Sequence, residues 1–338
     1  MNDEQPTGER QLLARVAYGY FIEGRTQEEI GRQLGFSRPK VQRLLERARE
    51  TGVVEIRIVG SSDSNLALEA RLRASFGLKD AIVTPNNPDP QMQRQALARA
   101  AAEYLERHVP NRGVIAVGMG RNTGELARYY RPPRRLECTF VSAMGGSPSV
   151  DAPTNPNDIC RALAERSGGQ SESLFAPAYV ESREVRDQVL RQEAVAHSLR
   201  IAATAGIALV GIGGTDDACT MVRSGCCPLE EMVRLRARGA VGDILGNYFD
   251  VTGRVIASDL NDRLVGLTLA DLRRVGTAIA VVSEADKSAA VLGALRTGVL
   301  DVLIVHEAIA GLLVDATGDE PAASPKARRP SGATERGS

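Results

Sequence analysis

The sequence lacks an excess of charge of either sign, because 42 lysine and arginine residues balance 42 aspartate and glutamate residues. A neutral chain has no general attraction for a polyanion, so any contact with nucleic acid requires a local basic surface. It also lacks a long uncharged apolar run: the stretch from Val299 to Val314 contains charges and falls short of a membrane span. The acidic, polar first ten residues are unlike a signal peptide. We therefore expect a cytoplasmic protein with no membrane partner.

Histidine and cysteine are scarce, with three and five residues in a chain of 338. The cysteine spacing is irregular and no histidine cluster accompanies it, so the sequence predicts reduced thiols and no metal site. The length is sufficient for two domains and a sizeable core.

Two short amphipathic helices are predicted near the start of the chain. Thr26 is placed to cap the first helix, with Glu29 completing a capping box. Gly35 is expected to end that helix in the left-handed conformation. Ser37 is expected to cap the second helix, and Pro39 falls in its first turn, where a missing amide costs little. This spacing predicts a tight helix-turn-helix.

The surroundings of these helices fit the same motif. Gly31 is small enough to let the two helices approach. A preceding helix is predicted over about Glu9 to Glu23, with one apolar face formed by Leu12, Leu13, Val16, Ala17 and Tyr20. The segment from Gly52 to Gly60 alternates like a strand, which suggests a winged variant.

The second helix separates an apolar face from a basic one. Val41, Leu44, Leu45 and Ala48 are expected to be buried. Arginine and lysine suit phosphates and guanine edges, and glutamine suits adenine edges. The predicted DNA-binding residues are Ser37, Arg38, Lys40, Gln42, Arg43 and Arg47. An ordinary solvated helix is the alternative, but it leaves the glycine turn and the capped start unexplained.

Residues 1–60 carry ten basic and nine acidic side chains, so one copy is expected to bind DNA weakly. We therefore expect the protein to act as a homodimer or homotetramer.

The rest of the chain alternates helical patterns with apolar strands, which predicts an α/β domain with a parallel sheet covered on both faces. The polar segment SSDSN at 61–65 marks a domain boundary. The predicted organisation is a DNA-binding domain over 1–60, a ligand-binding domain over 61–315 and a disordered tail over 316–338. In such sheets, ligands bind beyond the carboxyl ends of the strands.

Three strand ends carry candidate ligand-binding residues. In GMGRNTG (118–124), Gly120 and its neighbouring glycines let the backbone approach an anion at a helix start, where Arg121, Asn122 and Thr123 offer donors. The spacing G-x-G-x-x-x-G is not the dinucleotide fingerprint, so no cofactor is predicted. In AMGGS, Gly145 and Gly146 suit a loop near a ligand or a plain tight turn. Lys287, which follows VVSEAD, is placed for a phosphate or carboxylate, although a solvated lysine is the alternative.

From about Leu12 to Val314, the chain resembles the SorC/DeoR-type sugar-responsive transcriptional regulators. FSRPKVQRLLERARETGVVEIRI is close to that family's form, and VGMGRNTGELA, VSAMGG, LFAPAYV, GAVGDILGNYFDVTGRVI and DKSAAVLGALRTGVLDVLIVHEAIAGLL follow in the family's order. The resemblance implies an effector domain similar in fold to sugar-phosphate isomerases, which binds sugars, sugar phosphates or polyols without converting them. It implies a DNA-binding regulator, not an enzyme, whose operator affinity responds to that ligand.

The resemblance also implies roles for single residues. It places the loop 120–123 and the pair Gly145 and Gly146 at the effector, Asp243 near it, and Lys287 at its phosphate. Many relatives carry a glycine pair before that lysine, whereas this chain has SEAD, in which Glu284 and Asp286 would repel a phosphate. A neutral sugar or sugar alcohol is therefore a candidate beside a sugar phosphate.

The segment PTNPND (153–158) is the expected specificity loop, because Asn155 and Asn157 offer hydrogen bonds to hydroxyl groups. The alternative function is a sugar-phosphate isomerase or deaminase fused to a DNA-binding domain. None of the chain's three histidines follows a glycine-rich strand end, so in such an enzyme a carboxylate would have to act as the catalytic base.

Overall fold

The computed structural model describes residues 5–54, 63–148 and 154–318. The chain divides into two compact units, Met1–Gly60 and Ser61–Ser338, and each is described by itself. The strand expected over 52–60 and the tail expected over 316–338 fall largely outside the described residues. Among the described residues, no helix is both long and apolar enough to cross a membrane.

The first unit is built from three helices, α1 (Gln5–Phe21), α2 (Gln27–Leu34) and α3 (Arg38–Glu50). The predicted capping box at Thr26 and Glu29 is present, and Gly35 ends α2 with a φ of +72°. Ser37 stands at the cap of α3, but the prediction that it caps the helix was wrong in one respect. Its hydroxyl accepts no hydrogen bond from the described amides of the first turn.

The core of this unit contains most of the apolar residues that the sequence pattern selected. Its buried members are Leu13, Val16, Ala17, Ile30, Val41, Leu45 and Ala48. Leu12 and Leu44 are only partly buried. Tyr20 was placed wrongly, since it is 37% exposed.

The second unit contains a seven-stranded parallel sheet in the order β1-β9-β8-β5-β2-β3-β4. The strands are β1 (Asp80–Thr84), β2 (Val114–Val117), β3 (Thr139–Ser142), β4 (Gln170–Glu172), β5 (Ile207–Gly211), β8 (Thr277–Val281) and β9 (Val302–His306). The expected α/β fold with a parallel sheet is therefore confirmed. The C-terminal ends of β8, β5, β2 and β3 lie side by side, which brings their following loops together at one edge.

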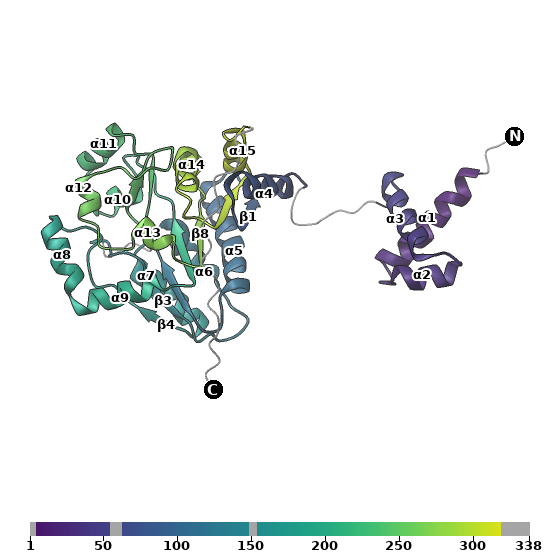
Figure 1. Ribbon diagram of the computed structural model, residues 1–338, viewed down its shortest axis with the longest axis horizontal. Coiled ribbons are helices and arrows are strands. Elements are labelled where there is room, and N and C mark those ends of the chain that lie inside the picture. The colour runs from purple at the N-terminus through teal and green to yellow at the C-terminus, as the bar shows by residue number, and fades with distance from the viewer. Residues whose placement is uncertain (1–4, 55–62, 149–153, 319–338) are drawn as a thin grey trace. The chain divides into compact units, whose positions relative to one another are not determined.

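Helices cover both faces of the sheet (Figure 1). One face packs against α5 (Pro90–His108), α6 (Arg121–Tyr129) and α7 (Pro156–Ser167), and the other against α4 (Asp63–Phe76), α9 (Glu193–Ala203), α14 (Ser288–Arg296) and α15 (Glu307–Asp315). Along β5, Ile207 and Leu209 enter the first core while Ala208 and Val210 enter the second. Burial of both faces explains the uninterrupted apolar strand sequences.

The remaining elements are short and lie mostly between β4 and β8. Between β4 and β5, α8 (Arg183–Arg191) and α9 follow one another directly and are separated by Gln192. Four short helices follow: α10 (Thr220–Arg223), α11 (Leu229–Ala237), α12 (Asp259–Asp262) and α13 (Leu269–Leu272). The 3-10 turn η1 (Ala285–Lys287) leads from β8 into α14.

A small antiparallel hairpin, β6 (Gly242–Ile244) and β7 (Asn247–Phe249), carries an acidic residue to the edge of the sheet. Its two turn residues, Leu245 and Gly246, have φ values of +53° and +76°. Glycine adopts this conformation readily, but leucine does so only with strain, which is typical of a turn beside a functional site.

Candidate functional site

The basic face of α3 is open to solvent. All six residues predicted to bind DNA, Ser37, Arg38, Lys40, Gln42, Arg43 and Arg47, are exposed. Nζ of Lys40 lies 4.0 Å from the centre of the Phe36 ring, which fixes this side chain beside the turn. Arg47 differs from the others because its Nε lies 2.9 Å from a carboxylate oxygen of Glu9 on α1. Its charge is therefore partly compensated within the unit.

In the second unit, a small enclosed cavity of about 30 Å³ lies beyond the C-terminal ends of the central strands. It is lined by Met119, Gly120, Arg121, Asn122, Met144, Gly211, Ile212, Gly213, Thr220, Met221, Asp243, Leu245, Glu284 and Lys287. The structure thus brings together five of the nine predicted effector-binding residues, Gly120, Arg121, Asn122, Asp243 and Lys287. A cavity of this volume holds roughly two water molecules, so it is narrow in this conformation.

Asp243 is the most deeply buried carboxylate at this cavity, with 4% of the residue exposed. Its Oδ2 accepts a hydrogen bond of 2.8 Å from the amide of Gly246. No donor among the described residues reaches its Oδ1. Burial raises the pKa of Asp243 to about 6, against the opposing effects of the Gly246 amide and Lys287. A buried acceptor without a partner calls for a ligand or water that donates a hydrogen bond.

The backbone beside Asp243 leaves no room for a larger residue. Gly213 and Asp243 exchange backbone hydrogen bonds of 2.9 and 3.2 Å. A Cβ atom on Gly213 would stand 1.8 Å from Oδ1 of Asp243. The glycine after β5 therefore allows the carboxylate to lie directly against the end of the central strand.

Glu284 is surrounded by cationic and amide donors. Its Oε1 lies 3.5 Å from Nη2 of Arg94 and 3.3 Å from Nη2 of Arg121. Its Oε2 lies 3.2 Å from Nζ of Lys287 and accepts a hydrogen bond of 3.0 Å from Nδ2 of Asn122. Burial acts to raise the pKa of Glu284, but Lys287, Asn122 and the two arginines outweigh it and lower the pKa to about 2.

Two members of this cluster differ from what the sequence suggested. Glu284 was expected to repel a phosphate or to bond the hydroxyls of a neutral polyol, and instead it pairs with three cations of the protein. Arg94 was not predicted to take part. Arg94 lies near the start of α5, 190 residues before Glu284, and nothing in the local sequence marks it as part of the site. Asn122 is held from both sides, because its Oδ1 also accepts a hydrogen bond of 2.7 Å from the hydroxyl of Ser283.

The other predicted effector residues lie elsewhere. Oγ1 of Thr123 is 3.2 and 3.0 Å from the carbonyl oxygens of Gly118 and Gly120, so the fully buried threonine holds the loop and does not line the cavity. A Cβ atom on Gly145 would stand 2.2 Å from the carbonyl oxygen of Pro177, so close backbone packing accounts for this glycine.

Gly146 and Asn155 line a neighbouring open hollow of about 540 Å³. The side chain of Asn155 caps α7 by accepting a hydrogen bond of 3.1 Å from the amide of Asn157. The loops of the two sites are tied together by backbone, since the amide of Gly120 donates a hydrogen bond of 3.2 Å to the carbonyl oxygen of Thr154, the residue before Asn155.

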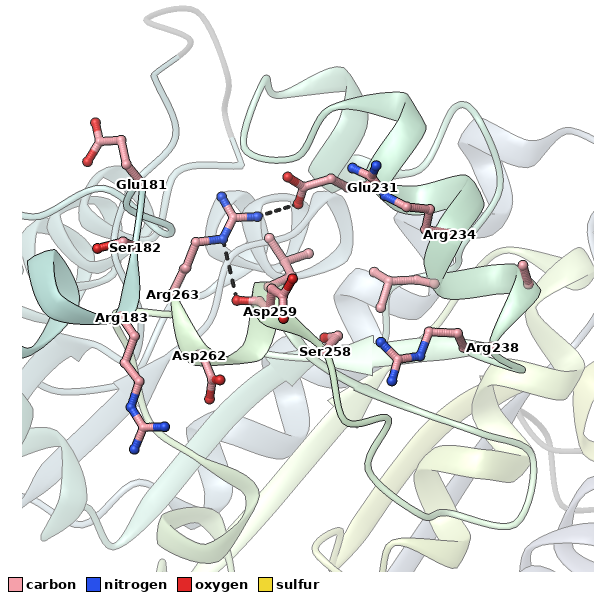
Figure 2. A pocket seen from close by; sticks show the side chains of 13 residues that line it. Glu181, Ser182, Arg183, Glu231, Arg234, Arg238, Ser258, Asp259, Asp262 and Arg263 are labelled. Carbon is pink, nitrogen blue, oxygen red and sulfur yellow. Dashed lines mark hydrogen bonds and ion pairs between the residues drawn. The ribbon is translucent and has the colours of Figure 1, made fainter.

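A wider groove of about 860 Å³ lies apart from the strand ends, between the start of α8, α11 and α12. Figure 2 shows Glu181 and Arg183 on the wall opposite Arg234 and Arg238. Arg263 crosses the groove and pairs with Glu231 (Figure 2). Its lining charges balance, with four arginines (Arg183, Arg234, Arg238, Arg263) against four acids (Glu181, Glu231, Asp259, Asp262). Despite its size, this groove offers weaker chemical evidence for a ligand than the enclosed cavity does.

Comparison with known proteins identifies similar chains over most of this length. The family described as "Putative sugar-binding domain" matches residues 62–315. The transcriptional regulator LsrR of Klebsiella pneumoniae subsp. pneumoniae is 33% identical over 89% of this chain and 92% of its own. The erythritol catabolism regulatory protein EryD of Brucella abortus is 29% identical over 90% of this chain and 96% of its own.

The solved structures agree with the sequence comparison. The full-length sorbitol operon regulator SorC of Klebsiella pneumoniae superposes with a TM-score of 0.69 at 26% identity, covering 91% of this chain and 99% of that one. The similarity therefore extends over both units and is not confined to the sheet domain.

Proposed function

Since this chain belongs to the SorC/DeoR-type family of sugar-responsive transcriptional regulators, we propose that a small polyhydroxy ligand bound at the edge of its sheet controls the affinity of α3 for an operator. The relatives are regulators and not enzymes, which does not favour an isomerase or deaminase activity. The observation that carries the proposal is Asp243, which lines the cavity and whose buried Oδ1 has no donor among the described residues.

In the first unit, the exposed face of α3 enters the major groove. Arg38, Gln42 and Arg43 contact base edges, because their side chains are exposed and able to form the hydrogen bonds that distinguish base pairs. Ser37 and Lys40, at the turn, contact phosphates. Arg47 contributes less than the sequence suggested, since Glu9 already pairs with it.

In the second unit, a ligand hydroxyl donates to Oδ1 of Asp243 while the loop 120–122 supplies donors at the start of α6. The closed cavity is too small for a sugar, so ligand binding must select or create a more open arrangement of the surrounding loops. Asn155 lies on the neighbouring hollow and would contact the far end of the ligand. A change of loop arrangement gives the ligand a route to alter DNA affinity, with a coupling of roughly 1–3 kcal/mol typical of allosteric pairs.

The test begins with a thermal-shift screen of the purified protein against sugars, alditols and their phosphates, followed by calorimetry on any ligand found. Asp243→Asn and Asn122→Ala should weaken that ligand by roughly tenfold or more, as expected for the loss of about one buried hydrogen bond. Neither variant should change ligand-free binding to operator fragments selected from random-sequence DNA.

Arg263→Ala is the matched control, because it removes a partly buried polar contact from the wider groove instead. It should leave ligand affinity unchanged. If Arg263→Ala weakens the ligand while Asp243→Asn and Asn122→Ala do not, the ligand binds in the groove and the proposed site is wrong.

A further inference from the structure

Building on the proposed function, we propose that Glu284 occupies the anion-binding position of this site with its own carboxylate, so that the site takes an uncharged polyol or sugar and excludes phosphorylated ones. Glu284 is thereby the specificity-determining residue for the class of ligand.

Donors from three separate elements converge on this one carboxylate. Arg94 comes from α5, Arg121 from the start of α6, and Lys287 from the turn after β8. All three cations lie within 3.5 Å of an oxygen of Glu284, and Asn122 donates a further hydrogen bond of 3.0 Å. Clustered arginine and lysine donors at a helix start are the arrangement by which proteins bind phosphate groups. In this protein the two oxygens that accept from these donors belong to the Glu284 carboxylate and not to a bound phosphate.

The cluster is also largely buried. The side chains of Glu284 and Lys287 are 12% and 11% exposed, so water screens their charges poorly. Lys287 also donates a hydrogen bond of 3.0 Å to the carbonyl oxygen of Ile212, which holds its ammonium group in place. A phosphate entering the cluster would have to remove Glu284 from three cations and leave its charge without partners near the buried carboxylate of Asp243. Separating one member from a buried ion cluster is strongly unfavourable.

The charge balance around the cavity leads to the same ligand class. Arg94, Arg121 and Lys287 contribute three positive charges, while Glu284 and Asp243 remove two, which leaves one. A phosphate dianion would exceed that remaining charge, whereas a hydroxyl group needs no compensation. A polyol matches the acceptor that remains available, since a hydroxyl group can donate to Oδ1 of Asp243, which has no donor among the described residues.

The test uses inorganic phosphate as the probe, because its result does not depend on knowing the natural ligand. The full chain and its Glu284→Gln variant are titrated with phosphate by calorimetry, and their melting temperatures are compared with and without phosphate. Glutamine keeps the size of the side chain but removes the charge, so the three cations become available. We expect phosphate to bind Glu284→Gln at least roughly tenfold more tightly than the unchanged protein and to raise the melting temperature of the variant alone.

Two further variants make the result specific. Adding Lys287→Ala to Glu284→Gln should remove most of the gain, because a cation of the cluster is lost. Glu125→Gln removes a comparably buried glutamate that pairs with Arg128 on α6 and does not line the cavity, and it should show no gain. If Glu284→Gln does not fold, Glu284→Ser serves in its place. Equal phosphate affinity in the unchanged protein and the Glu284 variant, or an equal gain in Glu125→Gln, overturns the inference.

Matched pairs of a sugar or alditol and its monophosphate then test the ligand class directly. Tighter binding of the phosphorylated member by the unchanged protein overturns the exclusion. If the proposed function is wrong, Asp243→Asn will leave the affinity for neutral ligands unchanged. The phosphate titration of Glu284→Gln still decides the role of Glu284 in that case.

Discussion

The carbonyl oxygen of Phe36 lies 2.5 Å from the position that a Cβ atom on Gly31 would occupy. The amide of Phe36 also donates a hydrogen bond of 2.8 Å to the carbonyl oxygen of Gly31. The turn between α2 and α3 therefore folds back onto the helix before it, and only the absence of a side chain permits this contact. The placement of α3 depends on this contact.

Gly31→Ala should destabilise the first unit by roughly 1–3 kcal/mol, because backbone atoms must move to admit the methyl group. Operator binding should fall with it. Gly311→Ala is the control, since a Cβ atom on Gly311, within α15, would have no neighbour within 4 Å among the described residues, and it should be neutral or stabilising by about 0.4–1 kcal/mol. Thermal unfolding followed by circular dichroism measures both, and an unchanged first unit in Gly31→Ala would refute the steric argument.

Arg43→Ala should weaken specific DNA binding by roughly 1–3 kcal/mol if Arg43 contacts a base with two of its guanidinium nitrogens. Affinities are measured by fluorescence anisotropy for a selected operator and for random DNA at one salt concentration. Arg15→Ala, which removes an exposed arginine from α1, controls for the loss of charge. Equal losses on operator and random DNA for Arg43→Ala would show that Arg43 touches only phosphate.

Asp243 should make stability depend on pH in a defined window. Burial raises the pKa of Asp243 from 3.8 to about 6. Between these two pH values, Asp243 is protonated in the folded state and ionised in the unfolded state. The protonated carboxyl group contributes its full share to the free energy of unfolding below pH 3.8, the pKa of the unfolded state. This contribution is lost as the pH rises through about 6, and the total loss is about 3 kcal/mol.

Asp243→Asn lacks this proton, so its stability relative to the unchanged protein should rise by about 3 kcal/mol between about pH 4 and pH 7. Urea unfolding at several pH values gives the difference, and Asp259→Asn, which removes an exposed carboxylate, is the control. A difference for Asp243→Asn that stays constant over this range would rule out the raised pKa.

The nearly balanced charge of residues 1–60, ten basic against nine acidic, predicts that tight operator binding needs more than one copy. We expect a dimer or tetramer assembled through the second unit. Light scattering at the concentrations used for operator binding measures the assembly. A monomer that binds its operator tightly would contradict this expectation.

Much of the first unit was predictable because its signals are local. The capping box of Thr26 and Glu29 and the left-handed Gly35 each depend on residues a few positions apart, and the structure confirms both. Tyr20 was misplaced because helical periodicity identifies a face but not its edge, and α1 ends at Phe21, soon after it. The parallel sheet of the second unit was predictable as well, because a strand that is buried on both faces shows a continuous apolar run in its own local sequence.

The sequence by itself determined the parallel-sheet fold, the strand ends that carry polar residues and the family to which the chain belongs. Only the tertiary structure decided which of those residues meet. Asn122 and Arg94 reach Glu284 across 162 and 190 residues of chain, and the order of the strands, not the spacing of the residues, sets these contacts. The same packing turned Thr123 and Gly145 inward as supports and left Oδ1 of Asp243 without a donor among the described residues. The charge environment of a site is a sum over neighbours in space, so a local sequence pattern could assign Glu284 a charge but not its partners.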